Sequence, residues 1–103
     1  MKTLIKNGLI VDGSGKPGFK GSLLIDGDRI EKIGDVAENG DMKVIDASGL
    51  VVSPGFIDTH SHSDLQILLN PEVLPKVMQG VTTEVLGQDG VAMAPLPEQY
   101  ISP

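Results

Sequence analysis

Short apolar runs separated by turn-forming residues characterise the first half of the chain. Runs of this kind predict strands over residues 3–11, 21–26, 29–33, 42–46 and 50–53. Asp26-Gly27-Asp28 separates the second run from the third and favours a hairpin, because Asp-Gly tolerates the positive φ of tight turns. We therefore predict that residues 1–53 form a mainly antiparallel β-module without a long helix.

The pattern changes at Pro54-Gly55, where longer and more mixed segments begin. A strand, one or two helical turns and a second strand are predicted over Phe56–His60, 73–79 and 81–86. Gly80 is expected to end the helical turns. Because strand, helix and strand in this order are typical of a parallel sheet, residues 54–103 are predicted to start an α/β domain.

The composition narrows the possible classes of function. A net charge of −6 with a single arginine leaves no basic cluster for phosphate groups, so we expect neither nucleic acid nor an anionic membrane as a partner. The 103 residues suffice for at most one domain of typical size, and the absence of cysteine excludes disulfides and thiolate metal ligands. No signal-peptide apolar region follows Met1 and no run could cross a membrane, so we expect a cytoplasmic protein.

His60-Ser61-His62 is the segment with the clearest chemical potential. On a strand, residues i and i+2 face the same side, about 6.6 Å apart at roughly 3.3 Å rise per residue. Two imidazoles at this separation can converge on one metal ion, and Asp58 on the same face could accept the second N–H of a ligating histidine. The alternative is that these two histidines, the only ones in the chain, are ordinary surface residues.

Other side chains suggest weaker hypotheses. Asp64 is predicted either to hydrogen-bond to a residue that binds the metal or to cap the N-terminus of a helix. Glu84 is expected to be a solvated or edge residue of its strand, and the pattern offers no partner for Lys76. Met78 and Met93 are expected to fill the core.

Four stretches carry a resemblance to a known family. Residues 52–62, Val-Ser-Pro-Gly-Phe-Ile-Asp-Thr-His-Ser-His, resemble the first barrel strand of the amidohydrolase superfamily, which supplies metal ligands in an H-x-H motif. Residues 5–8 and 25–34 resemble segments of the small β-sandwich module with which the superfamily begins. Residues 79–96 are similar to the N-acyl-D-amino-acid deacylase, or D-aminoacylase, branch.

The resemblance implies a mixed α and β fold. Residues 1–53 would be the antiparallel portion of a β-sandwich, and residues 54–103 would be the first strands and helix of a truncated (β/α)8 metallo-hydrolase barrel. A complete barrel needs about 200 residues or more. Further metal ligands and the catalytic aspartate are therefore expected outside this chain, and the exposed strand edges are expected to lead to self-association.

The metal implied by the resemblance is Zn²⁺ or another divalent ion, held by His60 and His62. D-aminoacylases carry a cysteine ligand in a Gly-Asn-Cys-Gly turn, where this chain has Gly87-Gln88-Asp89-Gly90. Asp89 could replace the thiolate, because carboxylate oxygen also binds Zn²⁺, although as a harder ligand. Alternatively, Asp89 is a turn residue without a role in metal binding.

The activity implied by the resemblance is metal-assisted hydrolysis of the amide bond of N-acyl-D-amino acids. Two alternatives remain open: hydrolysis of cyclic amides, as in dihydroorotases and hydantoinases, and a non-catalytic β-rich assembly module. Because the later ligands are absent, the chain by itself is expected to bind metal weakly and to be inactive.

Overall fold

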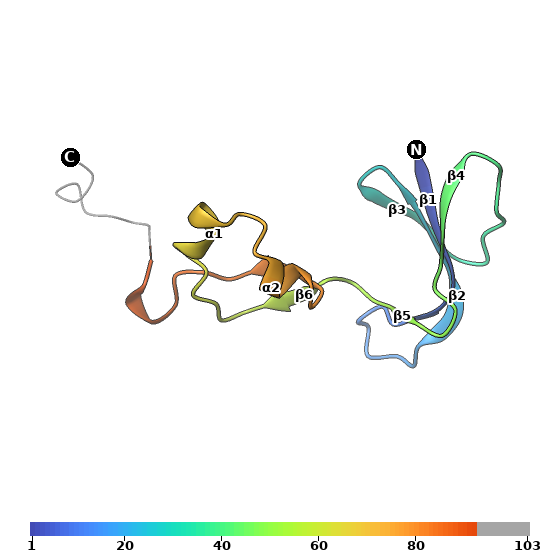
Figure 1. Ribbon diagram of the computed structural model, residues 1–103. Coiled ribbons are helices and arrows are strands. Elements are labelled where there is room, and N and C mark those ends of the chain that lie inside the picture. Colours follow the sequence, from blue (N-terminus) through green and yellow to red (C-terminus); the bar gives the residue numbers. More distant parts are fainter. Residues whose placement is uncertain (93–103) are drawn as a thin grey trace. The chain divides into compact units, whose positions relative to one another are not determined.

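The computed structural model describes residues 1–92, and these belong to two compact units (Figure 1). The first unit runs from Met1 to Pro54 and the second begins at Gly55. Each contains its own sheet. No helix in the described part of the chain is long and apolar enough to cross a membrane. Met93, a predicted core residue, lies outside the described residues.

A five-stranded sheet makes up the first unit. Its strands are β1 (Lys2–Ile10), β2 (Phe19–Asp26), β3 (Arg29–Gly34), β4 (Met42–Asp46) and β5 (Val51–Val52). These bounds lie within two residues of the predicted runs. β1 is central, with β2 on one side and with β4 and then β5 paired along its other side.

The direction of two strands differs from the prediction. β1 with β2 and β2 with β3 are antiparallel pairs, as expected. β4 and β5, however, run parallel to β1, so the prediction of a mainly antiparallel module is wrong for this edge. Parallel neighbours require a crossover connection, and here the β2–β3 hairpin with the loop over residues 35–41 returns the chain to the far side of β1.

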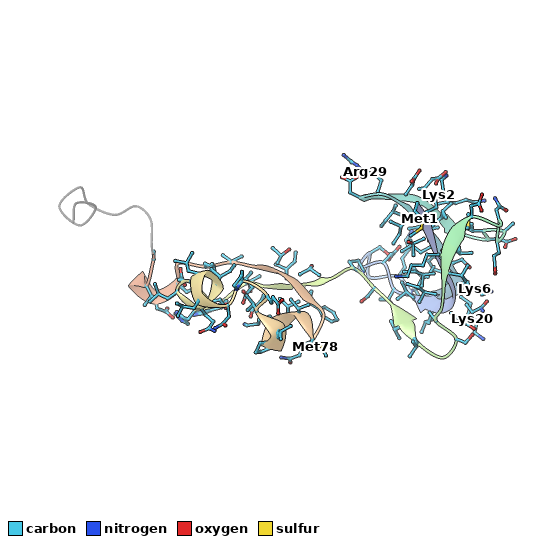
Figure 2. The ribbon with its side chains drawn as sticks, turned by 45° about the horizontal axis from the view of Figure 1, so that its top comes forward. Met1, Lys2, Lys6, Lys20, Arg29 and Met78 are labelled. Atoms are coloured by element: carbon cyan, nitrogen blue, oxygen red, sulfur yellow. The ribbon has the colours of Figure 1, made fainter. Side chains whose placement is uncertain are left out.

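The apolar core of the described residues is small and belongs to the first unit. Its buried side chains are Leu4, Ile10, Leu24 and Ala47. Ion pairs on the surface add contacts between strands. Lys2 on β1, labelled in Figure 2, pairs with Glu31 on β3 at 2.6 Å. Exposed pairs of this kind stabilise a fold only weakly, so the sheet depends mainly on its backbone ladder and on these few apolar contacts.

The second unit confirms the strand, helix and strand order. β6 (Phe56–Asp58) and β7 (Val81–Glu84) form a parallel pair, and between them lie two short helices, α1 (Gln66–Leu69) and α2 (Leu74–Val77). A 3-10 turn, η1 (Gln88–Gly90), follows β7.

Several details of the second unit differ from the prediction. β6 ends at Asp58, so His60 lies in the turn after the strand and not on it. α1 has no counterpart among the predicted elements. Met78 is 80% exposed and projects from the second unit (Figure 2), so the expectation that it fills the core is wrong. The ends of short strands depend on individual hydrogen bonds, which an apolar pattern does not encode.

Candidate metal centre

The turn that follows β6 carries the two histidines. Asp58, the last residue of β6, accepts a hydrogen bond from the His60 backbone N–H at 3.1 Å. The Ser61 backbone N–H donates to the Val85 carbonyl at 3.3 Å, which attaches the turn to the chain just after β7. The side chains of His60 and His62 are exposed, whereas Ser61 is buried. The alternation expected of a strand therefore continues past its end.

A second turn brings Asp89 to the histidines. Asp89 has a φ of 54° and lies between Gly87 and Gly90, which both have a φ of 80°. Glycine adopts this left-handed conformation freely, and aspartate is one of the few other residues that visit it. The Gly-Gln-Asp-Gly sequence therefore allows a tight turn directly after β7, with the Asp89 carboxylate on the side of the histidines.

The structure brings the three predicted ligands together. Asp89 Oδ2 lies 2.9 Å from His60 Nε2 and 3.2 Å from His62 Nε2. One potential ligand atom from each of the three residues lies within 4.8 Å of the others. The imidazole rings lie 5.4 Å apart between centroids, in an edge-to-face arrangement. All three side chains are roughly half exposed, at 59%, 48% and 65%, so an ion from solution can reach them.

The donor set fits a divalent transition metal. Two imidazole nitrogens and one carboxylate oxygen are ordinary ligands of Zn²⁺, and three protein ligands are typical of zinc sites that keep a position open. Both imidazoles offer the same type of nitrogen, Nε2, to the shared carboxylate oxygen. Imidazole suits several transition metals, and the carboxylate adds affinity for harder ions.

Asp58 does not have its predicted partner, and Asp64 does not cap a helix. Asp58 Oδ2 pairs with Lys76 Nζ and not with an imidazole, so the prediction that it orients a ligating histidine through the ring is wrong. Asp64 is 4% exposed, and its Oδ1 accepts a hydrogen bond from the Gly87 N–H at 3.1 Å. Because α1 begins after Leu65 without a side-chain cap, the helix-cap alternative for Asp64 is also wrong.

Glu84 is a residue of this site that the sequence pattern missed. Its side chain is 12% exposed, so the expectation of a solvated residue is wrong. Glu84 Oε1 accepts hydrogen bonds from the hydroxyls of Ser61 at 2.6 Å and Ser63 at 3.0 Å, and it pairs with Lys76 at 3.2 Å. Two features of the sequence could have indicated this role. Glu84 is the charged residue of a strand rich in β-branched residues, and Ser61-His62-Ser63 places two hydroxyls on one face of the chain.

The electrostatics of this group follow from its hydrogen bonds. The Ser61 hydroxyl, followed by Ser63 and Lys76, holds the pKa of Glu84 below its ordinary value. The hydrogen bond from Lys76 lowers the pKa of Asp58, and the same contact raises the pKa of Lys76, with Glu84 as the next contributor. The three groups are therefore all charged at neutral pH.

Comparisons with known proteins identify the family of this chain. Residues 43–100 match the amidohydrolase family. The N-acyl-D-aspartate deacylase of Alcaligenes xylosoxydans xylosoxydans is 46% identical over 98 residues, which cover 95% of this chain and 20% of that protein.

Two solved structures are also similar. A D-aminoacylase, studied for the functional role of its binuclear metal center, aligns with a TM-score of 0.85 and 41% identity over 91% of this chain and 20% of its own. The N-acyl-D-glutamate deacylase from Bordetella bronchiseptica, in complex with zinc and a phosphonate inhibitor, aligns with a TM-score of 0.83 and 42% identity over 93% of this chain and 21% of its own.

The chain thus spans about a fifth of the length of these relatives. The family match covers more than half of its own 103 residues and includes all three clustered side chains. The protein belongs to the amidohydrolase family.

Proposed function

We propose that this chain supplies part of the metal centre of a hydrolase that cleaves the amide bond of N-acyl-D-amino acids. The observation that carries the proposal is the convergence of His60, His62 and Asp89 on one point. Relatives named for the deacylation of N-acyl-D-aspartate and N-acyl-D-glutamate support the substrate class.

The proposed ion is Zn²⁺, bound by His60 Nε2, His62 Nε2 and an oxygen of Asp89. Zinc in the similar N-acyl-D-glutamate deacylase supports this choice. When bound in such a site, a divalent metal polarises the carbonyl of the amide and makes water a better nucleophile. The two imidazoles bind in their neutral form, and the Asp89 carboxylate offsets part of the ion's charge.

The architecture proposed for this function follows the two units. Residues 1–53 are proposed to be part of a β-sandwich module, and residues 54–103 to be the start of a (β/α)8 barrel. The parallel β6–β7 pair supports the barrel assignment, because strands joined through a helix and paired in parallel are its repeating element. His60 and Asp89 both follow the carboxyl ends of these strands, where barrel enzymes form their active sites.

Zinc titration of the 103-residue chain tests the ligand assignment. We expect the wild-type chain to bind Zn²⁺ and each of His60→Ala, His62→Ala and Asp89→Ala to bind it at least about tenfold more weakly, because each loses one of three protein ligands. Asp41→Ala, which removes an exposed carboxylate of the first unit, is the matched control. Equal zinc affinity in all five proteins would contradict the assignment.

The substrate class requires a protein of the relatives' length. A chimera in which this chain replaces the matching segment of the N-acyl-D-aspartate deacylase can be assayed with N-acyl-D-amino acids, their L-enantiomers and dihydroorotate. We expect turnover of N-acyl-D-amino acids only. Turnover of dihydroorotate in their place, or no turnover by a folded and metal-loaded chimera, would contradict the proposal.

A further inference from the structure

The interior of the second unit is polar. Its buried side chains in the described residues are Ser61 at 3%, Ser63 at 7% and Asp64 at 4% exposure, whereas Phe56 and Ile57 of β6 are more than 60% exposed. Buried hydroxyls and carboxylates are stable only when they are hydrogen-bonded, so the partners of these groups determine how the turn after β6 is held.

One oxygen atom holds both serines. Glu84 Oε1 accepts hydrogen bonds from Ser61 Oγ at 2.6 Å and from Ser63 Oγ at 3.0 Å. Because side chains alternate along this extended turn, drawing the two serines inward turns His60 and His62 to the opposite, exposed side. The contact links the histidine turn to β7, the strand that leads to Asp89.

Lys76, on α2, pairs with the carboxylates of both strands. Its ammonium lies 3.2 Å from Glu84 Oε1 and also pairs with Asp58 Oδ2. Lys76 thereby offsets two carboxylates that face the same space. The pKa of Glu84 is lowered mainly by the Ser61 hydroxyl, and Ser63 and Lys76 add to this effect. Asp58 in turn accepts the His60 backbone N–H with its other oxygen, at 3.1 Å. Contacts thus run from α2 through both strands to the histidine turn.

We infer that Glu84 is a positioning residue for the proposed metal centre: by holding Ser61 and Ser63 inward, it fixes the spacing and direction of His60 and His62 toward a divalent cation. The inference rests on the proposed function, since it assumes that the two histidines bind a metal. Glu84 makes no hydrogen bond or ion pair with either imidazole or with Asp89, so it acts through the backbone of the turn.

Two substitutions of Glu84 separate positioning from general stability. Glu84→Leu removes both acceptor oxygens, whereas Glu84→Gln keeps one oxygen that can accept the serine hydroxyls. We expect Glu84→Leu to weaken Zn²⁺ binding by about tenfold or more, the range seen when groups that orient metal ligands are removed. Glu84→Gln should restore most of the affinity, and the d–d absorption of bound Co²⁺ should change in Glu84→Leu alone.

Glu72→Leu and Glu72→Gln are the matched controls. Glu72 is exposed on the same unit and has no hydrogen bond or ion pair within residues 1–92. Neither control should alter zinc affinity or the Co²⁺ spectrum. If Glu84→Leu does not fold, the double variant Ser61→Ala with Ser63→Ala removes the same two hydrogen bonds and leaves the Glu84–Lys76 pair, and it should show the same loss of affinity.

A metal-free measurement separates this inference from the proposed function. In the apo chain, nuclear Overhauser contacts between the His60 and His62 rings and slow exchange of the Ser61 amide report the turn directly, since the rings lie 5.4 Å apart. Absence of zinc binding by the wild type would refute the proposed function. Loss of both signals in Glu84→Leu, but not in Glu84→Gln, would still support positioning, and signals unchanged in Glu84→Leu would overturn it.

Discussion

At the scale of single residues, Asp89 is the side chain on which the two imidazoles converge. Its Oδ2 lies within 3.2 Å of both Nε2 atoms, and its backbone has a φ of 54° in a turn flanked by glycines. Such a conformation is uncommon outside glycine, asparagine and aspartate. Aspartate therefore suits this position in two ways, by the backbone conformation that it tolerates and by the oxygen that it presents to the imidazoles.

Replacing this donor atom should change metal preference. In Asp89→Cys a soft thiolate takes the place of a hard carboxylate, so we expect affinity for Zn²⁺ and Cd²⁺ to rise relative to Mn²⁺ by at least about tenfold, or about 1.4 kcal/mol. Competition titrations with a chromophoric chelator measure this ratio. Asp41→Cys, far from the histidines in sequence, is the control, and an unchanged ratio in Asp89→Cys would show that residue 89 is not a ligand.

Gly55 is a second residue whose identity the structure explains. A Cβ atom at this position would lie 2.2 Å from both Oγ1 and Cγ2 of Thr82, so the two chain segments can approach only because residue 55 lacks a side chain. Thr82 lies on β7, and Gly55 directly precedes β6. The contact therefore sets how closely the two strands pair.

Gly55→Ala should destabilise the second unit by about 1–3 kcal/mol, the usual cost of forcing extra atoms into a filled space. Urea unfolding followed by the methyl signals of Val81 measures the free energy of unfolding of this unit. Gly40→Ala is the control, because a Cβ there meets no atom within 4 Å. Equal stabilities of the two variants would contradict the steric explanation.

At the scale of elements, α2 joins the two strands of the second unit through Lys76. The side chain pairs with Asp58 on β6 and with Glu84 on β7. Its pKa is raised above the ordinary 10.5, mainly by the hydrogen bond to Asp58, and the pKa of Glu84 is lowered from the ordinary 4.5, mainly by Ser61. The pair therefore contributes to stability only in the pH range in which both partners are charged.

The direction of the pH dependence follows from these shifts. The contribution of Lys76 is complete below pH 10.5 and is lost as the pH rises through its raised pKa. The contribution of Glu84 is present above pH 4.5 and is lost as the pH falls through its lowered pKa. Lys76→Met should lower the stability of the second unit at neutral pH and remove the alkaline loss.

Urea midpoints for the Val81 methyl signals across the pH range measure this effect. Lys43→Met, which removes an exposed lysine of β4, is the control and should retain the wild-type profile. An alkaline loss of the same size in Lys76→Met and in the wild type would show that Lys76 does not link the strands.

Local patterns predicted the strands of the first unit within two residues, because alternation and turns are properties of neighbouring residues. The parallel pairing of β4 and β5 with β1 was not predicted, since pairing depends on a crossover that spans the β2–β3 hairpin. The early end of β6 has a local cause, a side-chain contact between residues two positions apart that the apolar pattern does not encode. The Asp58 carboxylate accepts the His60 N–H and turns the chain out of the ladder.

At the scale of the whole molecule, residues 1–92 bury few apolar side chains and expose many. The buried set lies in the first unit, whereas Phe56 is 61%, Ile57 64% and Leu69 76% exposed. Apolar surface of this extent on a small chain favours association. The exposed apolar side chains of the second unit are of the kind that pack against another protein surface.

We therefore predict that the 103-residue chain self-associates in solution. Sedimentation velocity over a concentration series should show a weight-average mass that rises with concentration, because exposed apolar residues and the open edges of β3, β6 and β7 can pair between copies. Phe56→Lys with Ile57→Lys should reduce the association, and Lys43→Glu should not. A concentration-independent monomer would contradict the prediction.

The sequence alone was sufficient for the family, for the choice of His60 and His62 as candidate ligands, and for the strand, helix and strand order of the second unit apart from α1, because these depend on motifs and on local alternation. The tertiary structure alone decided that Asp89 meets the imidazoles and that Glu84 faces inward. These contacts join residues 21 to 29 positions apart. These contacts depend on the register between β6 and β7. A one-residue slip would move every side chain of one strand to the other face of the sheet, and the contacts would be lost.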